Sequence, residues 1–258
     1  MFKEIGVAAP TAHTLTAEER RKLSAAFAAL PPVHQRVPGE RLRSVSYVDG
    51  MPNTALASTV NRDEPFQVLD ITIRAGVLRQ GVSEWFAWKE RTCFEVAGST
   101  LSVDVEAGKL DAIVHLLLLE ATHVVDSCLR ITPDFRPGDR STPATAFTEG
   151  VWSGRTTASP RYRDPLLERV RFRADGQILA LDQAESLYAT LHRTPLASLY
   201  GSSNWYDDLA EYVALDHLTE VLGQPFRIVI RKEGKEVSAY EPMKSVLARP
   251  GRPDEAIL

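Results

Sequence analysis

The stretch IVHLLLLEATHVVD, residues 113–126, decides how this chain folds. It lies at the centre of a nearly continuous apolar run from Leu110 to Cys128. Because this run is longer than an ordinary strand, it predicts a buried helix. Glu120 and His123 interrupt the apolar run, and an unpaired charge in such surroundings is costly. We therefore expect both side chains to have partners inside the fold.

The spacing of Glu120 and His123 matches part of a metal-binding pattern. In the H-E-x-x-H arrangement, two histidines one helical turn apart hold a zinc ion, and the glutamate between them acts as general base on the bound water. Here Leu119 occupies the place of the first histidine, and leucine has no lone pair to donate. An isolated E-x-x-H also occurs on ordinary helices, where the two side chains hydrogen-bond each other. The pattern alone leaves both interpretations open.

A second polar stretch, YGSSNWYDDLAE at residues 200–211, predicts another helix that presents carboxylates. Asp207 and Glu211 are four residues apart and therefore share one helix face. Asn204 is a good N-cap, and acidic residues in the first turn complement the helix dipole, which accounts for Asp208. Glu211 lies one turn further along, where the benefit from the dipole has mostly faded. Glu211 is therefore a candidate for a role in a site.

Together the two stretches resemble the gluzincin group of zinc metallopeptidases, most closely its lethal-factor-like branch. The pattern of that branch is H-E-x-x-H-x-x-D, followed by a tyrosine and then by an E-x-x-A-E helix. In this chain the matching stretches lie within residues 110–216. The resemblance implies an α+β, zincin-like metallopeptidase fold with a central buried active-site helix, a mixed sheet and a second helix on the C-terminal side.

The resemblance also implies roles for individual residues. His123 would bind the metal, and Asp207 would stand at the place of the third ligand. Glu120 would be the general base, and Tyr200 would stabilise the oxyanion that develops on an amide carbonyl. Aspartate is one methylene shorter than the glutamate of the pattern, but it also ligates zinc in proteins.

Asp126 and Glu211 would orient histidine ligands, as residues behind a metal site generally do. The departure at Leu119 removes one ligand of the implied site. A complete zinc site contributes roughly 10–16 kcal/mol, so each of its ligands represents on the order of 3–5 kcal/mol. His115 cannot replace the missing ligand, because it lies about 12 Å along the helix from His123. His217 is ten residues past Asp207, nearly three helical turns away, and cannot replace the missing ligand either. Zinc is therefore expected in an intact parent or ancestor, with weak or absent binding in this chain.

The sequence accordingly predicts a metallopeptidase-like protein whose zinc-dependent hydrolysis of peptide bonds is lost or impaired. The alternative is a metal-free peptide-binding or interaction module, that is, a pseudoenzyme. In that case Glu120, His123 and Glu211 would form a buried, hydrogen-bonded cluster that specifies helix packing. Either interpretation gives the protein a peptide or protein as its partner.

The rest of the chain shows a mixture of helical and strand periodicity. Helices are predicted at residues 16–30, 182–191 and 204–222, and strands at residues 67–74, 100–106, 226–231 and 236–240. Capping boxes are predicted at Thr16 and Asp182, each with a glutamate three residues later. These elements indicate an α+β domain.

Two proline-rich segments divide these elements. Pro31, Pro32 and Pro38 predict a linker over residues 31–42. Residues 1–42 would then be an N-terminal helical appendage and linker, and residues 43–258 a zincin-like catalytic-type domain. Residues 131–165 predict a long irregular connection, in which Trp152 either packs onto the core or belongs to a loop that grips substrate.

Composition sets limits on the partners. A formal charge of −4 shows no basic excess, so we expect no binding of nucleic acid. Cys93 and Cys128 lack metal-binding or disulfide spacing and are expected as buried thiols. The apolar stretch from Ile113 to Leu119 is far shorter than the roughly 18–20 residues of a membrane span, so none is expected. The N-terminal residues show no export signal, which leaves the location open with the cytoplasm as the default.

Overall fold

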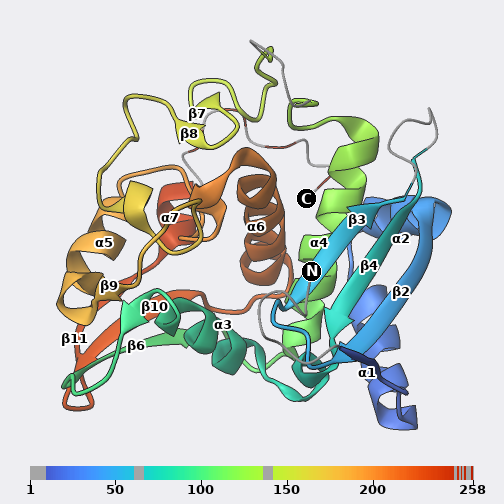
Figure 1. The fold of residues 1–258 in the computed structure, drawn as a ribbon, viewed down its shortest axis with the longest axis horizontal. Helices are drawn as coiled ribbons and strands as arrows, with labels where there is room; N and C mark the ends of the chain where they lie inside the picture. The colour runs from blue at the N-terminus through green and yellow to red at the C-terminus, as the bar shows by residue number, and fades with distance from the viewer. Residues whose placement is uncertain are drawn as a thin grey trace.

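The predicted central helix is present as α4 (Ala112–Leu129). In this computed structural model, which describes residues 10–60, 67–135, 142–246, 249, 251, 253 and 257, α4 lies between a sheet and helix α6 (Figure 1). By length and hydropathy α4 could cross a membrane, but 72% of it is buried inside the structure. It ends at Arg130, whose φ of 54° is left-handed. α4 is therefore the helix around which the other elements pack.

A four-stranded mixed sheet covers one side of α4. Its strand order is β1 (Thr11–Ala12), β2 (Leu42–Asp49), β4 (Leu69–Arg74), β3 (Ala55–Thr59). β2 and β4 run parallel, whereas β3 pairs antiparallel with β4 and forms an edge of the sheet. The alternation that predicted β4 is confirmed, because Leu69, Ile71 and Ile73 are buried. β3 also contacts α4, which brings the edge strand to the central helix.

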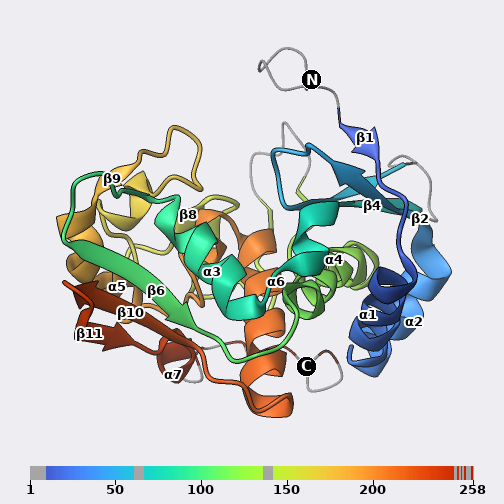
Figure 2. The same cartoon turned by 90° about the horizontal axis from the view of Figure 1, so that it is seen from below.

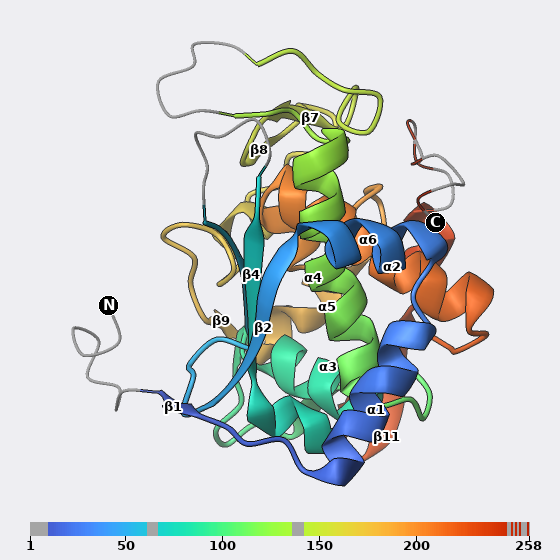
Figure 3. The ribbon, with the colours of Figure 1, turned by 90° about the vertical axis from the view of Figure 1, so that its right-hand side faces the viewer.

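Two N-terminal helices lie against α4 (Figure 3). α1 (Ala17–Ala28) begins with the predicted capping box, in which Thr16 and Glu19 exchange hydrogen bonds. The prediction of a linker over residues 31–42 is wrong, because most of this segment is helix α2 (Pro32–Arg41). Pro32 begins the helix, where its missing N–H costs no hydrogen bond. Val33, His34 and Val37 are buried, and their burial explains why the helix persists despite Pro38.

A second, antiparallel sheet lies on the other side of the molecule (Figure 2). It has the order β11 (Lys235–Tyr240), β10 (Arg227–Lys232), β6 (Leu101–Glu106), and α3 (Val82–Arg91) packs beside β6. The predicted strand at 100–106 and the predicted terminal hairpin are confirmed. The hairpin turns at Glu233 and Gly234, which both have positive φ.

The remaining elements are short or lie on the C-terminal side. Helices are α5 (Ala184–Leu191), α6 (Trp205–Asp216) and α7 (Pro242–Val246), and the π-helical turn η6 (His217–Val221) follows α6. The 3-10 turns are η2 (Ala75–Arg79), η3 (Leu167–Arg169), η4 (Leu181–Gln183) and η5 (Gly201–Ser203). The short strand pairs are β5 (Phe94–Glu95) with β9 (Leu179–Ala180), and β7 (Trp152–Gly154) with β8 (Thr157–Ala158).

The start of α5 and the segment after α4 differ from the sequence predictions. The capping box at Asp182 is wrong, because Asp182 lies inside η4 and Gln183, which makes no side-chain cap, precedes α5. The predicted irregular connection after α4 holds the small hairpin β7–β8. Cys93 is buried and Cys128 partly buried, and both are free thiols. The architecture is therefore mixed α+β, with α4 at its centre.

Candidate functional site

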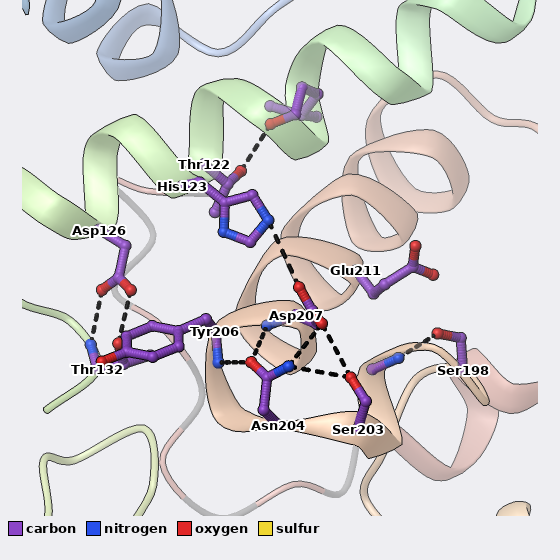
Figure 4. A network of polar contacts seen from close by, with 12 residues as sticks. Thr122, His123, Asp126, Thr132, Ser198, Ser203, Asn204, Tyr206, Asp207 and Glu211 are labelled. Carbon is purple, nitrogen blue, oxygen red and sulfur yellow. Dashed lines mark hydrogen bonds and ion pairs between the residues drawn. The ribbon is translucent and has the colours of Figure 1, made fainter. Parts of the chain in front are cut away.

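The first turn of α6 is fixed by Asn204 as predicted. The Asn204 side chain accepts hydrogen bonds from the amides of Tyr206, at 3.0 Å, and Asp207, at 3.1 Å. It also donates to Asp207 Oδ2 at 2.6 Å, and Ser203 donates to the same oxygen at 2.9 Å (Figure 4). The Asp207 carboxylate is therefore held in one orientation by its own helix start.

The other oxygen of Asp207 faces α4. Asp207 Oδ1 lies 3.7 Å from His123 Nε2, and the two side chains are 16% and 22% exposed. We call His123 and Asp207 the outer pair. The structure thus brings together the two residues that the resemblance implied as metal ligands, although they are 84 positions apart in sequence.

Glu120 lies deeper, with 5% of its surface exposed. Its Oε2 has no hydrogen-bond partner among the described residues. Burial raises the pKa of Glu120, and the charge of Asp207 adds to this, while His123 and a backbone hydrogen bond from Ala57 of β3 act in the opposite direction. Burial therefore opposes the ionisation of Glu120 more strongly than its neighbours promote it.

Tyr200 immediately precedes η5 and is close to the same carboxylates. Burial raises the pKa of Tyr200, and Asp207, Glu120 and Glu211 raise it further. Its hydroxyl therefore stays protonated and can act as a hydrogen-bond donor. Its ring packs edge-on against Phe172, with ring centroids 5.4 Å apart.

Besides its electrostatic interaction with His123, Asp126 makes hydrogen bonds to the segment that follows α4. Asp126 accepts hydrogen bonds from the amide of Thr132, at 2.7 Å, and from its hydroxyl, at 2.6 Å (Figure 4). Burial raises the pKa of Asp126, and these two hydrogen bonds partly offset that rise. The contacts tie the segment that follows α4 back onto the helix.

Glu211 belongs to a second polar group, which we call the inner cluster and which consists of Lys89, His115 and Glu211. Lys89 Nζ lies 2.5 Å from Glu211 Oε1, and His115 Nε2 lies 3.8 Å from the same oxygen. The Lys89 side chain is 9% exposed and that of Glu211 is fully buried. Sequence reasoning missed Lys89. The spacing could have indicated it, because Lys89 lies three residues after Phe86 and four after Trp85. This spacing places a lysine on the apolar face of α3.

Leu119 lies midway between the outer pair and the inner cluster. It is four residues after His115 and four before His123, so the three side chains share one face of α4. His115 and His123 both meet α6, so helix geometry places Leu119, which is 4% exposed, on the side of α4 that faces α6. The position without a ligand is thus directed at α6, between Asp207 and Glu211.

Asp208 lies in the first turn of α6, as expected for an acid that complements the helix dipole, and it is fully buried there. Its Oδ2 accepts a hydrogen bond from Trp152 Nε1 at 2.8 Å and lies 2.9 Å from Arg249 Nη1. The side chains of Asp208 and Arg249 are fully buried. Trp152 therefore packs onto the core beside α6, which is one of the two arrangements that the sequence left open.

The donor set does not fit a complete zinc site. A catalytic zinc ion has three protein ligands at about 2.0–2.2 Å. The outer pair supplies two donors, and their 3.7 Å separation is compatible with a shared ion. In the described part of the chain, no group of three or more His, Cys, Asp or Glu side chains could hold a metal ion. Leu119 stands where a third donor would be needed.

Comparisons of the chain with protein-family models, with curated proteins and with solved structures gave no match, so the residues of this centre carry the functional argument.

Proposed function

We propose that this protein is a metallopeptidase-like protein that binds peptides and whose hydrolytic centre is incomplete. The observation that carries the proposal is the outer pair, in which His123 of α4 and Asp207 of α6 lie 3.7 Å apart. Glu120 and Tyr200 are beside it, and burial raises the pKa of both. A tyrosine hydroxyl next to a polar pair suits the recognition of a peptide carbonyl.

The edge strand β3 supports a peptide as the partner. An extended peptide can add a strand to a free sheet edge, where main-chain hydrogen bonds give affinity. In the described part of the chain, β4 is the one strand that pairs with β3. Leu56 of β3 is 48% exposed, and the backbone of Ala57 reaches Glu120. A peptide on this edge would therefore pass the polar centre.

A small cavity beside α6 offers room for a side chain of such a peptide. Its volume is about 220 Å³, and Phe135, Trp152 and Trp205 contribute aromatic surface to its lining. Arg155, which lies over the Phe135 ring at 5.0 Å, also lines it. Trp205 precedes Asp207 by two residues on the same helix turn. The cavity thus offers both aromatic and polar surface to a side chain near the centre.

The incomplete set of metal donors argues against hydrolysis by this chain. The outer pair lacks a third donor, and each ligand of a structural zinc site represents on the order of 3–5 kcal/mol. We therefore expect weak or absent zinc binding and little or no peptidase activity in this chain. An intact parent or ancestor with a histidine at position 119 would hydrolyse peptide bonds with zinc.

The second candidate function is a metal-free interaction module without any metallopeptidase relationship. The observation that favours it is the inner cluster, in which the carboxylate of Glu211 is paired with a protein cation, Lys89. Under this alternative, the polar residues between α4 and α6 serve helix packing, and restoring a histidine has no effect on metal binding.

The test compares zinc binding by the unmodified chain with that of Leu119→His, using isothermal titration. Leu118→His is the matched control, because Leu118 is also buried but lies one position away on α4. The proposal predicts that Leu119→His binds zinc at least roughly tenfold more tightly than either of the other two proteins. Hydrolysis of a peptide library is measured on the same samples. Equal zinc affinity in the two histidine variants would refute the metallopeptidase relationship and favour the second candidate.

A further inference from the structure

The inner cluster contains an ion pair that is removed from solvent. Lys89 comes from α3 and Glu211 from α6, and their charged atoms are 2.5 Å apart. The second carboxylate oxygen of Glu211, Oε2, has no hydrogen-bond partner among the described residues. A single cation therefore balances a fully buried carboxylate.

Aromatic rings surround this cation. Lys89 Nζ lies 4.4 Å from the ring centroid of Tyr200, 5.0 Å from that of Trp85 and 5.8 Å from that of Phe86. Ring faces attract a cation, and the attraction grows when the cation is desolvated. Tyr200 thus links the inner cluster to the outer pair, because its ring meets Lys89 and the charge of Asp207 raises its pKa.

His115 does not act as the cation of the cluster. Burial lowers the pKa of His115, although Glu211 acts in the opposite direction. Its Nε2 is 3.8 Å from Glu211 Oε1, which is too long for a hydrogen bond. For Glu211, burial by itself would raise the pKa, but the charge of Lys89 is the largest opposing influence, and the pKa is lowered to about 2. Glu211 is therefore ionised, and Lys89 is its counter-ion.

We propose that Lys89 is an internal cation that takes the place of a metal-bound histidine as the partner of Glu211, and that it thereby keeps the centre in a metal-free form. This inference rests on the proposed function. A histidine at position 119 would face α6 between Asp207 and Glu211, where a carboxylate partner orients a metal-ligating imidazole. Lys89 already holds the nearest fully buried carboxylate. Its positive charge in a poorly solvated site also opposes the entry of a divalent cation.

The experiment measures zinc affinity in four proteins: the unmodified chain, Leu119→His, Lys89→Met, and Leu119→His combined with Lys89→Met. Lys89→Met removes the charge and keeps a side chain of similar length. Cobalt substitution provides a second readout, because its visible absorption reports the coordination geometry of the ion. The control is Lys22→Met in the Leu119→His background. Lys22 also forms an ion pair at α4, with Asp111 at 2.8 Å, but it lies at the start of the helix.

The double variant is expected to bind zinc at least roughly tenfold more tightly than Leu119→His alone, a gain of about 1.4 kcal/mol. Lys22→Met should leave the affinity of the Leu119→His protein unchanged. Equal affinities of Leu119→His and the double variant would overturn the role of Lys89 while leaving the proposed function in place. Failure of both to exceed the unmodified chain would overturn the proposed function, and the role of Lys89 with it.

Removal of Lys89 leaves Glu211 without its counter-ion, so the variant has to be checked for folding by circular dichroism. If Lys89→Met does not fold, Lys89→Gln replaces it, because glutamine removes the charge and can still donate a hydrogen bond to Glu211. The expected ranking of zinc affinities is the same. A Lys89→Gln double variant that binds no more tightly than Leu119→His counts against the proposal.

Discussion

The outer pair and the inner cluster lie on the same two helices, but they differ in how they are held. His123 and Asp207 are partly exposed and 3.7 Å apart, and neighbouring groups fix just one oxygen of Asp207. In the inner cluster, Lys89 and Glu211 are buried and 2.5 Å apart. Removing one partner of a buried ion pair strongly destabilises the folded protein, whereas an exposed ion pair contributes little to its stability. The inner cluster therefore serves the fold, and the outer pair is available for a ligand.

The largest expected effect comes from Lys89→Met. It should lower the free energy of unfolding by roughly 3–5 kcal/mol, because it leaves the charge of Glu211 buried without a partner. Urea denaturation followed by tryptophan fluorescence measures this. Adding Glu211→Gln should recover much of the loss, since the buried charge is then gone. A loss below about 1 kcal/mol for Lys89→Met would show that the inner cluster contributes no more than an exposed ion pair.

Acid should weaken the inner cluster in a defined range of pH. The folded-state pKa of Glu211 is about 2, below its ordinary value of 4.5. The stability that this group contributes is present above pH 4.5 and is lost as the pH falls towards 2, with a total on the order of 3 kcal/mol. Denaturation curves between pH 7 and pH 3 test this. The Lys89→Met/Glu211→Gln protein should lose less stability over that range, and equal losses would contradict the assignment.

Glu90, the neighbour of Lys89 on α3, should show the opposite dependence. Glu90 is buried, and Tyr188 donates a hydrogen bond to its Oε2 at 2.6 Å. Burial raises the pKa of Glu90 to about 7 from 4.5, despite the opposing effects of Tyr188 and Lys89. Its contribution is fully present below pH 4.5 and is lost as the pH rises through 7, by on the order of 2–3 kcal/mol. Glu90→Gln should flatten the stability profile between pH 5 and pH 8; a profile of unchanged slope would count against this.

The smallest expected effect on stability comes from the outer pair. His123→Ala should change the free energy of unfolding by less than about 1 kcal/mol, because the pair is partly exposed. The same substitution should weaken binding of an extended peptide several-fold, as measured by fluorescence titration. Asp207→Asn is the companion variant, since an amide can keep part of the contacts to the helix start. If His123→Ala destabilises the protein as much as Lys89→Met, the division between the two regions is wrong.

Much of the fold follows from patterns along the chain. The central helix, the alternating strand β4 and the terminal hairpin each have a periodicity that depends on local burial. α2 was missed because Pro31, Pro32 and Pro38 indicate a break in a local interpretation, whereas packing against α4 stabilises the helix. Local propensity is a weak guide where tertiary contacts decide.

The candidate site was predicted in part. The spacing within each helix indicated Glu120, His123 and Asp207, and the structure brings the last two together. Lys89 was not identified, because a lysine is ordinarily a surface residue and its partner lies 122 positions away. The partner of Asp126 was also not predicted, since Thr132 belongs to an irregular segment without periodicity. Contacts between distant segments are what the sequence pattern does not supply.

The buried pair of Arg249 and Asp208 bears on the order in which this centre is completed. Arg249 also donates to the carbonyl of Phe147, at 3.0 Å, and its guanidinium lies 3.8 Å from the Phe147 ring centroid. Arg249 thus forms an ion pair with the first turn of α6, which carries Asp207. The ribosome adds Arg249 42 positions after Asp207. During synthesis, the two helices can form and meet before this contact exists. One buried contact of the turn that carries Asp207 is therefore completed only after residue 249 has been added to the chain.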